Sequence, residues 1–308
     1  MTTTPPLRTW LPSWIFLSIS WGIAFYFIKI AGSDLSPIQI AFGRVGLGSI
    51  TVLIILFSVK QHLPNTSKAW FRANIAGFLQ HTAPFVLIAY SELSVSTILA
   101  GIAMAVTPIW TALFSMVFIP KDKISRNEYL GIFAGFIGVS VLIGIWEGSS
   151  GENNLFGVIA LILATAGYGG AVIYTRSKVT ELGFSPLSFI AAQLTASALQ
   201  LLLLCLLFTS IPTEVSTSTI WSILVLGILS TGFSFPLVYK IIRDVGSLAA
   251  ATISYASPII STLLGVILLR EKLHWYQPIG AALILYGVAL VQGISFPKLW
   301  SRRGDLNP

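Results

Sequence analysis

The chain has 308 residues, of which 55% are hydrophobic and only 9% are charged, and its mean hydropathy is +0.85. Soluble domains carry about 25% charged residues, so this composition excludes a soluble globular protein and indicates one that is integral to a membrane. The net charge is +7, and the single cysteine, Cys205, excludes an internal disulfide. On a membrane protein we interpret the positive charge as an orientation signal rather than as a surface for nucleic acid.

The first apolar run follows Arg8 and extends from Trp10 to about Ile28. A secretory signal peptide is the alternative interpretation, but its apolar region measures only about 7–15 residues. No small-residue cleavage site closes the run cleanly. We therefore predict that it is a retained first transmembrane span.

A membrane-spanning helix needs about 20 mostly apolar residues, and ten segments of the chain meet this requirement. Short connections separate them, and none is long enough to hold a soluble domain. The predicted fold class is therefore all-α integral membrane, with ten transmembrane helices. The predicted spans are residues 14–31, 38–59, 70–90, 96–119, 128–146, 155–175, 187–209, 219–239, 247–269 and 276–294.

Lysine and arginine are distributed unevenly over the connections. Cytoplasmic connections carry an excess of these residues, so the bias predicts the orientation. The N-terminus, the connections after spans 2, 4, 6 and 8, and the C-terminus carry most of the cations, and we predict that both termini are cytoplasmic. These cations are Arg8, Lys60, Lys68, Arg72, Lys121, Lys123, Arg126, Arg176, Lys178, Lys240, Arg243, Lys298, Arg302 and Arg303, against Lys29, Arg270 and Lys272 on the other side.

The second half of the chain repeats the pattern of the first at an offset close to 150 residues. The repeats, residues 1–147 and 148–308, hold five predicted helices each. Because five is an odd number, the second copy enters the membrane from the opposite side. Such inverted repeats are typical of secondary transporters, which bind substrate near the midplane between the halves. The matched pairs include Pro108 with Pro258, Gly77 with Gly227, Ser36-Pro37 with Ser185-Pro186, and Gly138 with Gly287.

Pro108 and Pro258 lie inside the fourth and ninth predicted spans, where helices normally exclude proline. Their matched positions favour a hinge in each repeat, which lets the two helices bend around a cavity. A static kink that neighbouring helices tolerate is the alternative.

The two halves of the chain together resemble a ten-helix transporter of the drug/metabolite transporter superfamily, of the kind built from two EamA domains. The resemblance rests on "SWGIAFYFIK", Pro37 and Arg44, on "TPIWTALFSMVFI" with "GIFAGFIGV", and on "SPIISTLLGVILLREKL" with "PIGAALILYGVAL". It implies a central cavity bounded by helices 1, 3, 4, 6, 8 and 9, with helices 5 and 10 peripheral. The family usually has Gly-Glu after the fourth helix. This chain has Asp122 in the acidic place there and Glu271 in the second copy, which we expect to tie the loop down.

Three ionisable side chains lie within or at the ends of the predicted spans, where such groups are costly and usually functional. His81 is expected to bind substrate or a proton, or to be a neutral histidine bonded to a neighbouring helix. Arg44 and Lys29 are expected at the outer vestibule. Arg44 alternatively forms a structural ion pair with Glu92 or Asp34, and Lys29 alternatively extends its amine to the interface.

Hydroxylated and aromatic side chains form the remaining candidates. The hydroxylated residues that recur at helical spacing on the fourth and ninth helices either line a water-filled cavity or permit close packing of the helices. The mid-span aromatic residues are expected to share one central pocket with His81, with packed or lipid-facing positions as the alternative. We interpret Gly131, Gly135 and Gly138 as packing residues, and Ser125 with Glu128 as a capping box. The polar candidates are Thr107, Thr111, Ser254, Ser257 and Ser261, and the aromatic candidates are Trp21, Trp110, Tyr168 and Tyr255.

No catalytic pair, metal-ligand spacing or cofactor motif occurs in the sequence. We therefore predict a secondary transporter without cofactor or metal, resident in the cell (inner) membrane and functional as a monomer, whose partners are lipid and a small-molecule substrate. An amino acid or related metabolite is the favoured cargo, moved outward by alternating access. The alternatives are an exporter of amphipathic drug-like compounds, a channel and a membrane-embedded enzyme. The first helix contains no acid, so transport is either facilitated or coupled to protons through His81.

Overall fold

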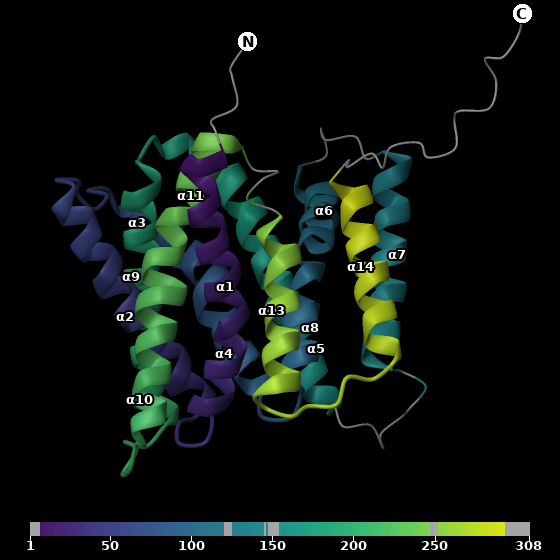
Figure 1. Cartoon of the computed structure of the whole chain (residues 1–308). Coiled ribbons are helices and arrows are strands. Elements are labelled where there is room, and N and C mark those ends of the chain that lie inside the picture. Colours follow the sequence, from purple (N-terminus) through teal and green to yellow (C-terminus); the bar gives the residue numbers. More distant parts are fainter. Residues whose placement is uncertain are drawn as a thin grey trace, which may run out of the picture.

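The computed structural model describes residues 7–119, 125–144, 146, 154–246, 250 and 252–292. Within these residues the secondary structure is entirely helical, and the helices form one bundle (Figure 1). Seven of them are long and apolar enough to cross a membrane, and shorter apolar helices accompany them. Many large apolar side chains point outward, such as Leu206, which is 74% exposed, and Phe133, which is 67% exposed. This is the surface expected where lipid replaces water.

The described helices lie at the ten predicted places, several of them divided by a local change in winding. The first repeat consists of α1 (Leu7–Ala31), α2 (Pro37–Ser58), α3 (Ser67–Gly77) with η1 (Phe78–Thr82) and α4 (Ala83–Ser91), α5 (Thr97–Ala103) with η2 (Met104–Val106) and α6 (Thr107–Phe118), and α7 (Arg126–Ile143). The second consists of α8 (Leu155–Tyr174) with η4 (Thr175–Val179) and η5 (Thr180–Leu182), α9 (Pro186–Phe208), α10 (Thr217–Leu224) with η6 (Val225–Phe233) and α11 (Ser234–Val245), α13 (Ile253–Ile267), and α14 (Tyr276–Val291).

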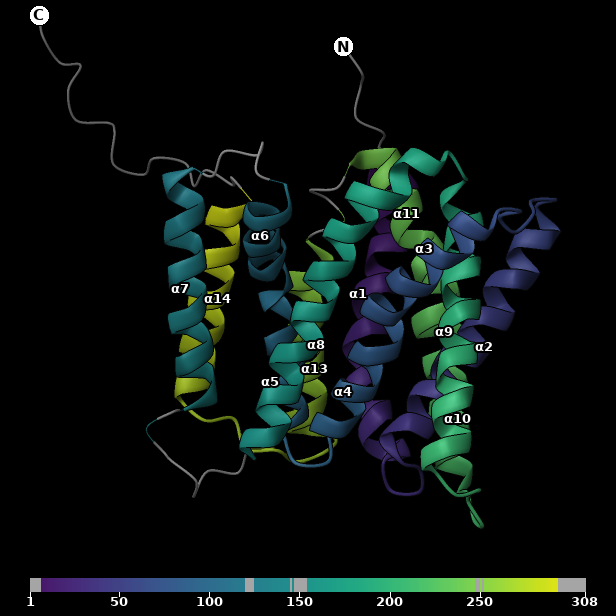
Figure 2. The ribbon, with the colours of Figure 1, turned by 180° about the vertical axis from the view of Figure 1, so that it is seen from behind.

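The two repeats run through the bundle in opposite directions. Helix α1 begins at the face where α14 ends, whereas α8 begins at the other face (Figures 1 and 2). We call the first the terminal face and the second the opposite face. The inverted arrangement predicted from the odd number of helices per repeat is therefore confirmed. The predicted boundary at residues 147 and 148, and Asp122, lie outside the described residues.

Polar caps mark the starts of most helices. Ser36 and Ser125 close capping boxes with Gln39 and Glu128, so the predicted box at the start of α7 is confirmed. Each side-chain oxygen satisfies a backbone N–H that has no partner in the first helical turn. Pro37 occupies the first turn of α2, where proline costs no hydrogen bond.

Helices α7 and α14 pair closely at one side of the bundle (Figure 2). A Cβ added to Gly138 would lie 2.7 Å from the backbone nitrogen of Ile284 and 3.0 Å from the carbonyl oxygen of Gly280. Gly131 likewise faces Gly287. Glycine thus lets the two backbones touch, because any side chain would force them apart. The packing role predicted for the fifth-helix glycines is confirmed.

The third and eighth spans each contain a π-helical turn, η1 and η6. An offset of 150 residues carries residues 78–82 onto residues 228–232, within η6, so the turns occupy equivalent places in the two repeats. A π-helical turn inserts an extra residue and re-aims the side chains beyond it. In this fold the π-helical turn changes the direction of the side chains in the middle of both spans.

The two matched prolines lie in different local structures. Pro108 occupies the first turn of α6, directly after the 3₁₀ turn η2. Pro258 lies inside α13, where its missing N–H interrupts the hydrogen bonding of a continuous helix. The fourth span therefore breaks before its proline, and the ninth span accommodates its proline within the helix.

At the opposite face, each repeat supplies a carboxylate to a helix N-terminus of the other. Asp34, between α1 and α2, accepts hydrogen bonds from the backbone N–H and hydroxyl of Ser216 at 2.8 and 2.5 Å, and from the Thr219 hydroxyl at 2.7 Å. Glu271, after α13, accepts bonds from the backbone N–H groups of Thr97 and Ile98 at 2.8 and 3.1 Å. The two repeats are thus joined at this face by two reciprocal caps. The expectation that Glu271 ties its loop down agrees with these contacts.

Candidate functional site

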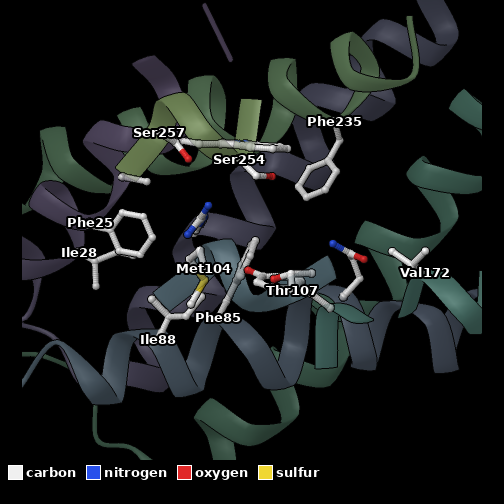
Figure 3. A pocket seen from close by; sticks show the side chains of 15 residues that line it. Phe25, Ile28, Phe85, Ile88, Met104, Thr107, Val172, Phe235, Ser254 and Ser257 are labelled. Carbon is white, nitrogen blue, oxygen red and sulfur yellow. The ribbon is translucent and has the colours of Figure 1, made fainter. Parts of the chain in front are cut away.

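A cavity of about 220 Å³ lies between the two repeats. Both halves of the chain line it, through α1, α2, η1, α4, η2 and α6 of the first repeat and α8, α11 and α13 of the second (Figure 3). The lining residues are Trp21, Ala24, Phe25, Ile28, Arg44, Gln80, Phe85, Ile88, Met104, Thr107, Tyr168, Val172, Phe235, Ser254 and Ser257. The six helices implied by the family resemblance all contribute, and α2 adds Arg44.

Both walls of the cavity combine aromatic and hydroxyl-bearing side chains. Ser254, Ser257 and Phe235 line one side, and Met104, Thr107 and Phe85 face them across the space (Figure 3). Phe25 and Ile28 lie at one end of the cavity. A solute in this space meets aromatic faces and hydroxyl groups together.

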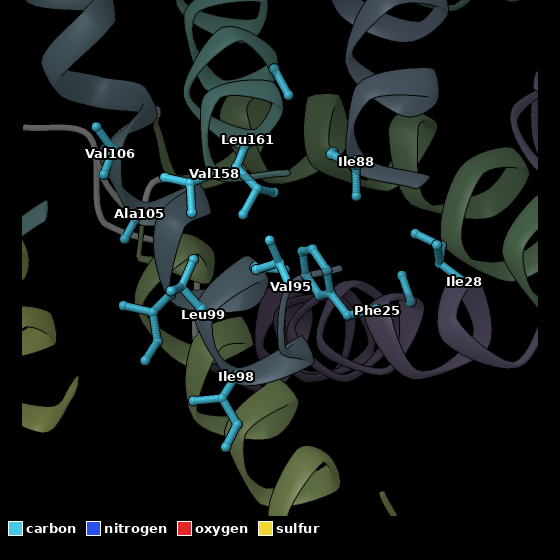
Figure 4. Packing of buried hydrophobic residues seen from close by; sticks show 14 of the residues in the cluster. Phe25, Ile28, Ile88, Val95, Ile98, Leu99, Ala105, Val106, Val158 and Leu161 are labelled. Carbon is cyan, nitrogen blue, oxygen red and sulfur yellow. The ribbon is translucent and has the colours of Figure 1, made fainter. Parts of the chain in front are cut away.

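The end of the cavity near Phe25, Ile28 and Ile88 belongs to the largest buried apolar cluster (Figure 4). Val95 and Ile98 extend this cluster toward the start of α5. Close apolar packing excludes water, so this cluster seals the cavity from the opposite face in the described conformation.

Five of the aromatic and hydroxylated side chains predicted for the cavity do line it. Trp21 contacts Phe235 with ring centroids 6.3 Å apart, and Tyr168 contacts Phe85 at 6.5 Å. Thr107 on α6 and Ser254 and Ser257 on α13 bring hydroxyl groups from the two proline-containing spans. An offset of 147 residues carries Trp21 onto Tyr168, and these two residues come from α1 and α8, the first helix of each repeat.

Arg44 lines the cavity instead of lying in an outer vestibule. Its side chain is buried, its guanidinium carbon lies 3.9 Å from the centre of the Phe85 ring, and its Nε donates a hydrogen bond to the Thr231 hydroxyl at 3.1 Å. A guanidinium is attracted to the face of an aromatic ring. The suggested ion pair is not formed, because Asp34 caps α10 and Glu92 accepts a bond from the hydroxyl of Thr97 at 3.0 Å.

His81 lies directly behind the cavity wall and has no exposed surface. Its ring contacts Phe85 and Phe235 at centroid distances of 5.6 and 4.7 Å. Neither ring nitrogen has a hydrogen-bond partner in the described part of the chain. The predicted alternative of a histidine bonded to a neighbouring helix is therefore not observed. The imidazole supports the two phenyl rings that line the cavity.

The remaining predicted residues lie outside this lining. Trp110 stacks on Phe114 at 5.7 Å, and the Tyr255 hydroxyl donates to the Gln292 side chain at 2.6 Å. Thr111 and Ser261 bond to backbone carbonyl groups one turn earlier in their own helices. Ser261 also packs against Gly101, which joins α13 to α5. Tyr255 and Ser261 thus join neighbouring segments, whereas Thr111 bonds within its own helix.

Lys29 lies at the opposite face, where its Nζ donates to the carbonyl oxygens of Glu92 and Val95 at 2.5 and 3.1 Å. The long side chain has folded back onto the connection between α4 and α5 instead of extending to the interface. Lys29 thus adds a third tie at this face, beside the caps made by Asp34 and Glu271.

The sequence-based prediction missed Gln80, Phe85 and Phe235 as lining residues. The repeat contained a signal for the two phenylalanines, because an offset of 150 residues carries Phe85 onto Phe235. These equivalent rings approach His81 from the two halves. Gln80 lies in the π-helical turn η1, and sequence periodicity does not anticipate the extra residue that re-aims this turn.

Several polar side chains in the lining have free hydrogen-bonding capacity. Tyr168, Gln80, Thr107, Ser254 and Ser257 make no side-chain hydrogen bond to another described protein group. Polar groups inside a membrane protein normally find partners, because the alternative is costly desolvation. Their open donors and acceptors are therefore available to a solute or to water. The described residues contain no group of ligands suited to a metal ion.

Two inverted five-helix repeats around a cavity between the halves define a multi-pass membrane transporter. The chain belongs to the EamA-like transporter family, whose profile matches residues 9–144 and again residues 155–292. The resemblance predicted from the sequence is therefore confirmed, and the protein is a transporter rather than an enzyme.

Relatives of known sequence agree with this assignment. An uncharacterized transporter of Archaeoglobus fulgidus is 27% identical over 290 residues, which is 91% of this chain and 99% of the relative. The uncharacterized transporter YoaV of Bacillus subtilis is 22% identical over 89% of this chain and 93% of its own. Protein PecM of Dickeya dadantii is 22% identical over 82% and 83% of the two chains. A solved crystal structure that is 20% identical superposes with a TM-score of 0.65 over 92% of this chain and 96% of its own, which supports the fold.

Proposed function

We propose that this transporter exports an amino acid or a closely related small metabolite across the cell (inner) membrane by alternating access. The observation that carries the proposal is the cavity between the repeats, where aromatic faces lie beside polar side chains with free hydrogen-bonding capacity. Such a lining suits a solute with an apolar side chain and polar ends. Trp21, Tyr168, Thr107, Ser254 and Ser257 are the proposed substrate contacts.

The remaining predicted residues have supporting roles in this proposal. His81, Trp110 and Tyr255 hold the cavity walls, and Thr111 and Ser261 hold the helices that carry them. Pro108 and Pro258 are the proposed hinges, and Lys29 belongs to the closure at the opposite face.

The size of the cavity favours a small solute over a drug-like one. Pockets for drug-sized ligands measure about 300–1,000 Å³, whereas this cavity measures about 220 Å³. A small amino acid needs less rearrangement of the walls than an amphipathic drug does. One chain encloses the whole cavity, which supports a functional monomer.

The proposed orientation places the terminal face, with both chain termini, in the cytoplasm. The excess of lysine and arginine on that side of the sequence supports it. Single cysteines at Ser125 and His274, introduced in a Cys205→Ala background, test the orientation. We expect a membrane-impermeant thiol reagent to label His274→Cys in intact cells and Ser125→Cys only after permeabilisation. The reverse pattern overturns the orientation.

The substrate proposal is tested by efflux. Cells are loaded with dipeptides that intracellular peptidases convert into single amino acids, and export is compared between cells that express the transporter and cells that express Trp21→Ala. We expect faster export of an aromatic or branched amino acid with the parent, and about a few-fold to tenfold loss in the variant, since one aromatic contact contributes about 0.5–1.5 kcal/mol. Equal export with the parent and with empty-vector cells for every amino acid overturns the proposal.

A further inference from the structure

One side chain gives the cavity a formal charge. Arg44 is 7% exposed and is the only charged residue in the cavity lining. Every acidic side chain that the structure describes lies elsewhere, either bonded to other groups or exposed at the surface. A buried cation without a counter-ion is costly inside a membrane, so its presence beside an open space calls for a partner of opposite charge.

We infer that the Arg44 guanidinium is the subsite for the carboxylate of the transported solute. This inference rests on the proposed function and names the chemical class of its cargo, a small monocarboxylate. The carboxylate supplies the missing counter-ion each time the cavity is occupied.

The geometry around Arg44 leaves the required donors free. A guanidinium has five N–H donors, and the described structure engages only the one on Nε, with Thr231. The guanidinium carbon lies over the ring of Phe85, which holds the planar group by its face and leaves its edge available. A carboxylate can accept two parallel hydrogen bonds from such an edge.

The rest of the lining fits the other parts of such a solute. Ser254 and Ser257 line the wall that faces Phe85 and Thr107 (Figure 3), and their hydroxyl groups can accept hydrogen bonds from an ammonium or amide. Trp21 and Phe235 supply apolar faces for a side chain. A phosphate fits less well, because groups with two negative charges call for several cations and this lining has one.

The charge belongs to one repeat only. Ser36 and Ser185 occupy equivalent positions, and eight residues after each of them lie Arg44 and the neutral Gln193. The cavity is therefore electrically asymmetric although its helices are related by pseudo-symmetry. A carboxylate has a single preferred end of the cavity, which gives the solute one orientation.

Matched acid and amide probes test the subsite on the purified full-length protein. The probes are phenylalanine with phenylalaninamide, and phenylacetate with phenylacetamide, and binding is measured by thermal stabilisation. We expect each acid to bind the parent about 10- to 100-fold more tightly than its amide, the range of a charge-assisted hydrogen-bonded pair. Arg44→Met, which keeps the length of the side chain without its charge, should abolish the difference. Arg44→Lys should retain part of it.

The control variant is Lys29→Met, which removes the cation at the opposite face and should leave the preference for the acids unchanged. The comparison of acid with amide on the parent does not depend on the folding of any variant. Equal binding of acid and amide to the parent overturns the carboxylate subsite, while export of amino acids in that case leaves the proposed function intact. Binding of phenylacetate without binding of phenylalanine supports the subsite and excludes phenylalanine as the cargo. Failure of all four probes to bind overturns the subsite, and the efflux assay then decides the proposed function on its own.

Discussion

The carboxylate of Glu271 caps a helix that begins 174 residues earlier in the chain, since its Oε1 lies 2.8 Å from the backbone nitrogen of Thr97. The Oε2 atom accepts the next N–H, that of Ile98, and Ser96 caps Leu99 at 3.2 Å. The exposed donors at the start of α5 are thus satisfied largely by the other repeat. In the proposed alternating-access cycle, we expect this contact between the repeats to break when the opposite face opens.

Glu271→Ala should favour the conformation that is open at the opposite face. A cap of this kind contributes about 0.5–2 kcal/mol, so the population of open molecules should rise by about 2- to 30-fold. A Ser257→Cys reporter in a Cys205→Ala background should react correspondingly faster with a thiol reagent applied at that face. Glu128→Ala is the matched control, because Glu128 caps its own helix at the terminal face. Unchanged labelling in Glu271→Ala would show that this cap does not hold the face closed.

The second cap, made by Asp34, should depend on pH. Hydrogen bonds from the Ser216 side chain, the Thr219 side chain and the Ser216 backbone hold the pKa of the Asp34 carboxyl well below its usual range. A group whose pKa is lowered on folding adds stability above its unfolded pKa of about 3.9, and this stability is lost as the pH falls through the folded pKa. The cap should therefore remain complete at neutral pH and persist in mild acid.

Hydrogen exchange of the amides at the start of α10 measures this cap. We expect their protection to fall in Asp34→Asn at neutral pH and to fall in the parent only in strong acid. Glu214→Gln, in the exposed connection that precedes α10, is the control and should behave like the parent. Loss of protection in the parent between pH 5 and 7 would contradict the assignment, because that window lies above both pKa values of Asp34.

The glycine contact between α7 and α14 should not tolerate a methyl group. A Cβ at Gly280 would lie 2.5 Å from the backbone nitrogen of Leu142 and 2.8 Å from the carbonyl oxygen of Gly138, and backbone atoms cannot move aside cheaply. We expect Gly280→Ala to destabilise the protein by about 1–3 kcal/mol, measured as a lower unfolding temperature in detergent. Gly46→Ala is the control, because its nearest neighbour is the edge of Phe42 at 4.0 Å. Equal unfolding temperatures for the two variants would refute close backbone contact.

The two prolines should respond differently to replacement. In Pro258→Ala the new N–H can bond to the carbonyl group of Ser254 within α13, which adds about 1 kcal/mol to the unbent helix. Transport should fall about fivefold while the unfolding temperature stays the same or rises. Pro108→Ala should change transport less, because a helix does not need an N–H bond in its first turn. Equal losses in both variants would mean that both prolines serve as hinges of the same kind.

Coupling to protons through His81 is one of the two alternatives that the sequence leaves open, the other being facilitated transport. A proton would reach His81 only in another conformation, because this side chain has no exposed surface here. In proteoliposomes with an imposed pH gradient, we expect the parent to accumulate substrate and His81→Gln to exchange it without accumulation. His62→Gln, at the connection between α2 and α3, is the control. Accumulation that survives in His81→Gln removes His81 from the coupling mechanism, and a parent that only equilibrates its substrate indicates facilitated transport.

The fold was predictable because the sequence patterns that mark it are strong and occur twice. A long run of apolar residues marks each span, and the matched prolines and glycines reveal the inverted repeat. Glycine positions on the fifth helix were interpreted correctly, since a face of small residues has few other uses in lipid. The winding of the helices was not predictable: the π-helical turns η1 and η6 leave no mark in composition or periodicity.

The site was only partly predictable, because the depth of a residue in the membrane does not determine the direction in which its side chain points. Trp21 and Trp110 both lie at mid-span, yet Trp21 faces the cavity and Trp110 stacks on Phe114. Arg44 lies closer to one end of its span, but its long side chain reaches Phe85 in the lining. Which neighbour a side chain contacts depends on the rotation of its helix about the helix axis. This rotation could not be derived from the sequence of one chain.

The close pairing of α7 with α14 also constrains how the protein is assembled at the ribosome. Helix α7 completes the first repeat, but its glycine face meets α14 only after the four intervening spans have entered the bilayer. During that interval the glycines that contact α14 in the folded protein lack this partner. We therefore expect the pairing of α7 with α14 to be among the last helix contacts that form as the chain is made.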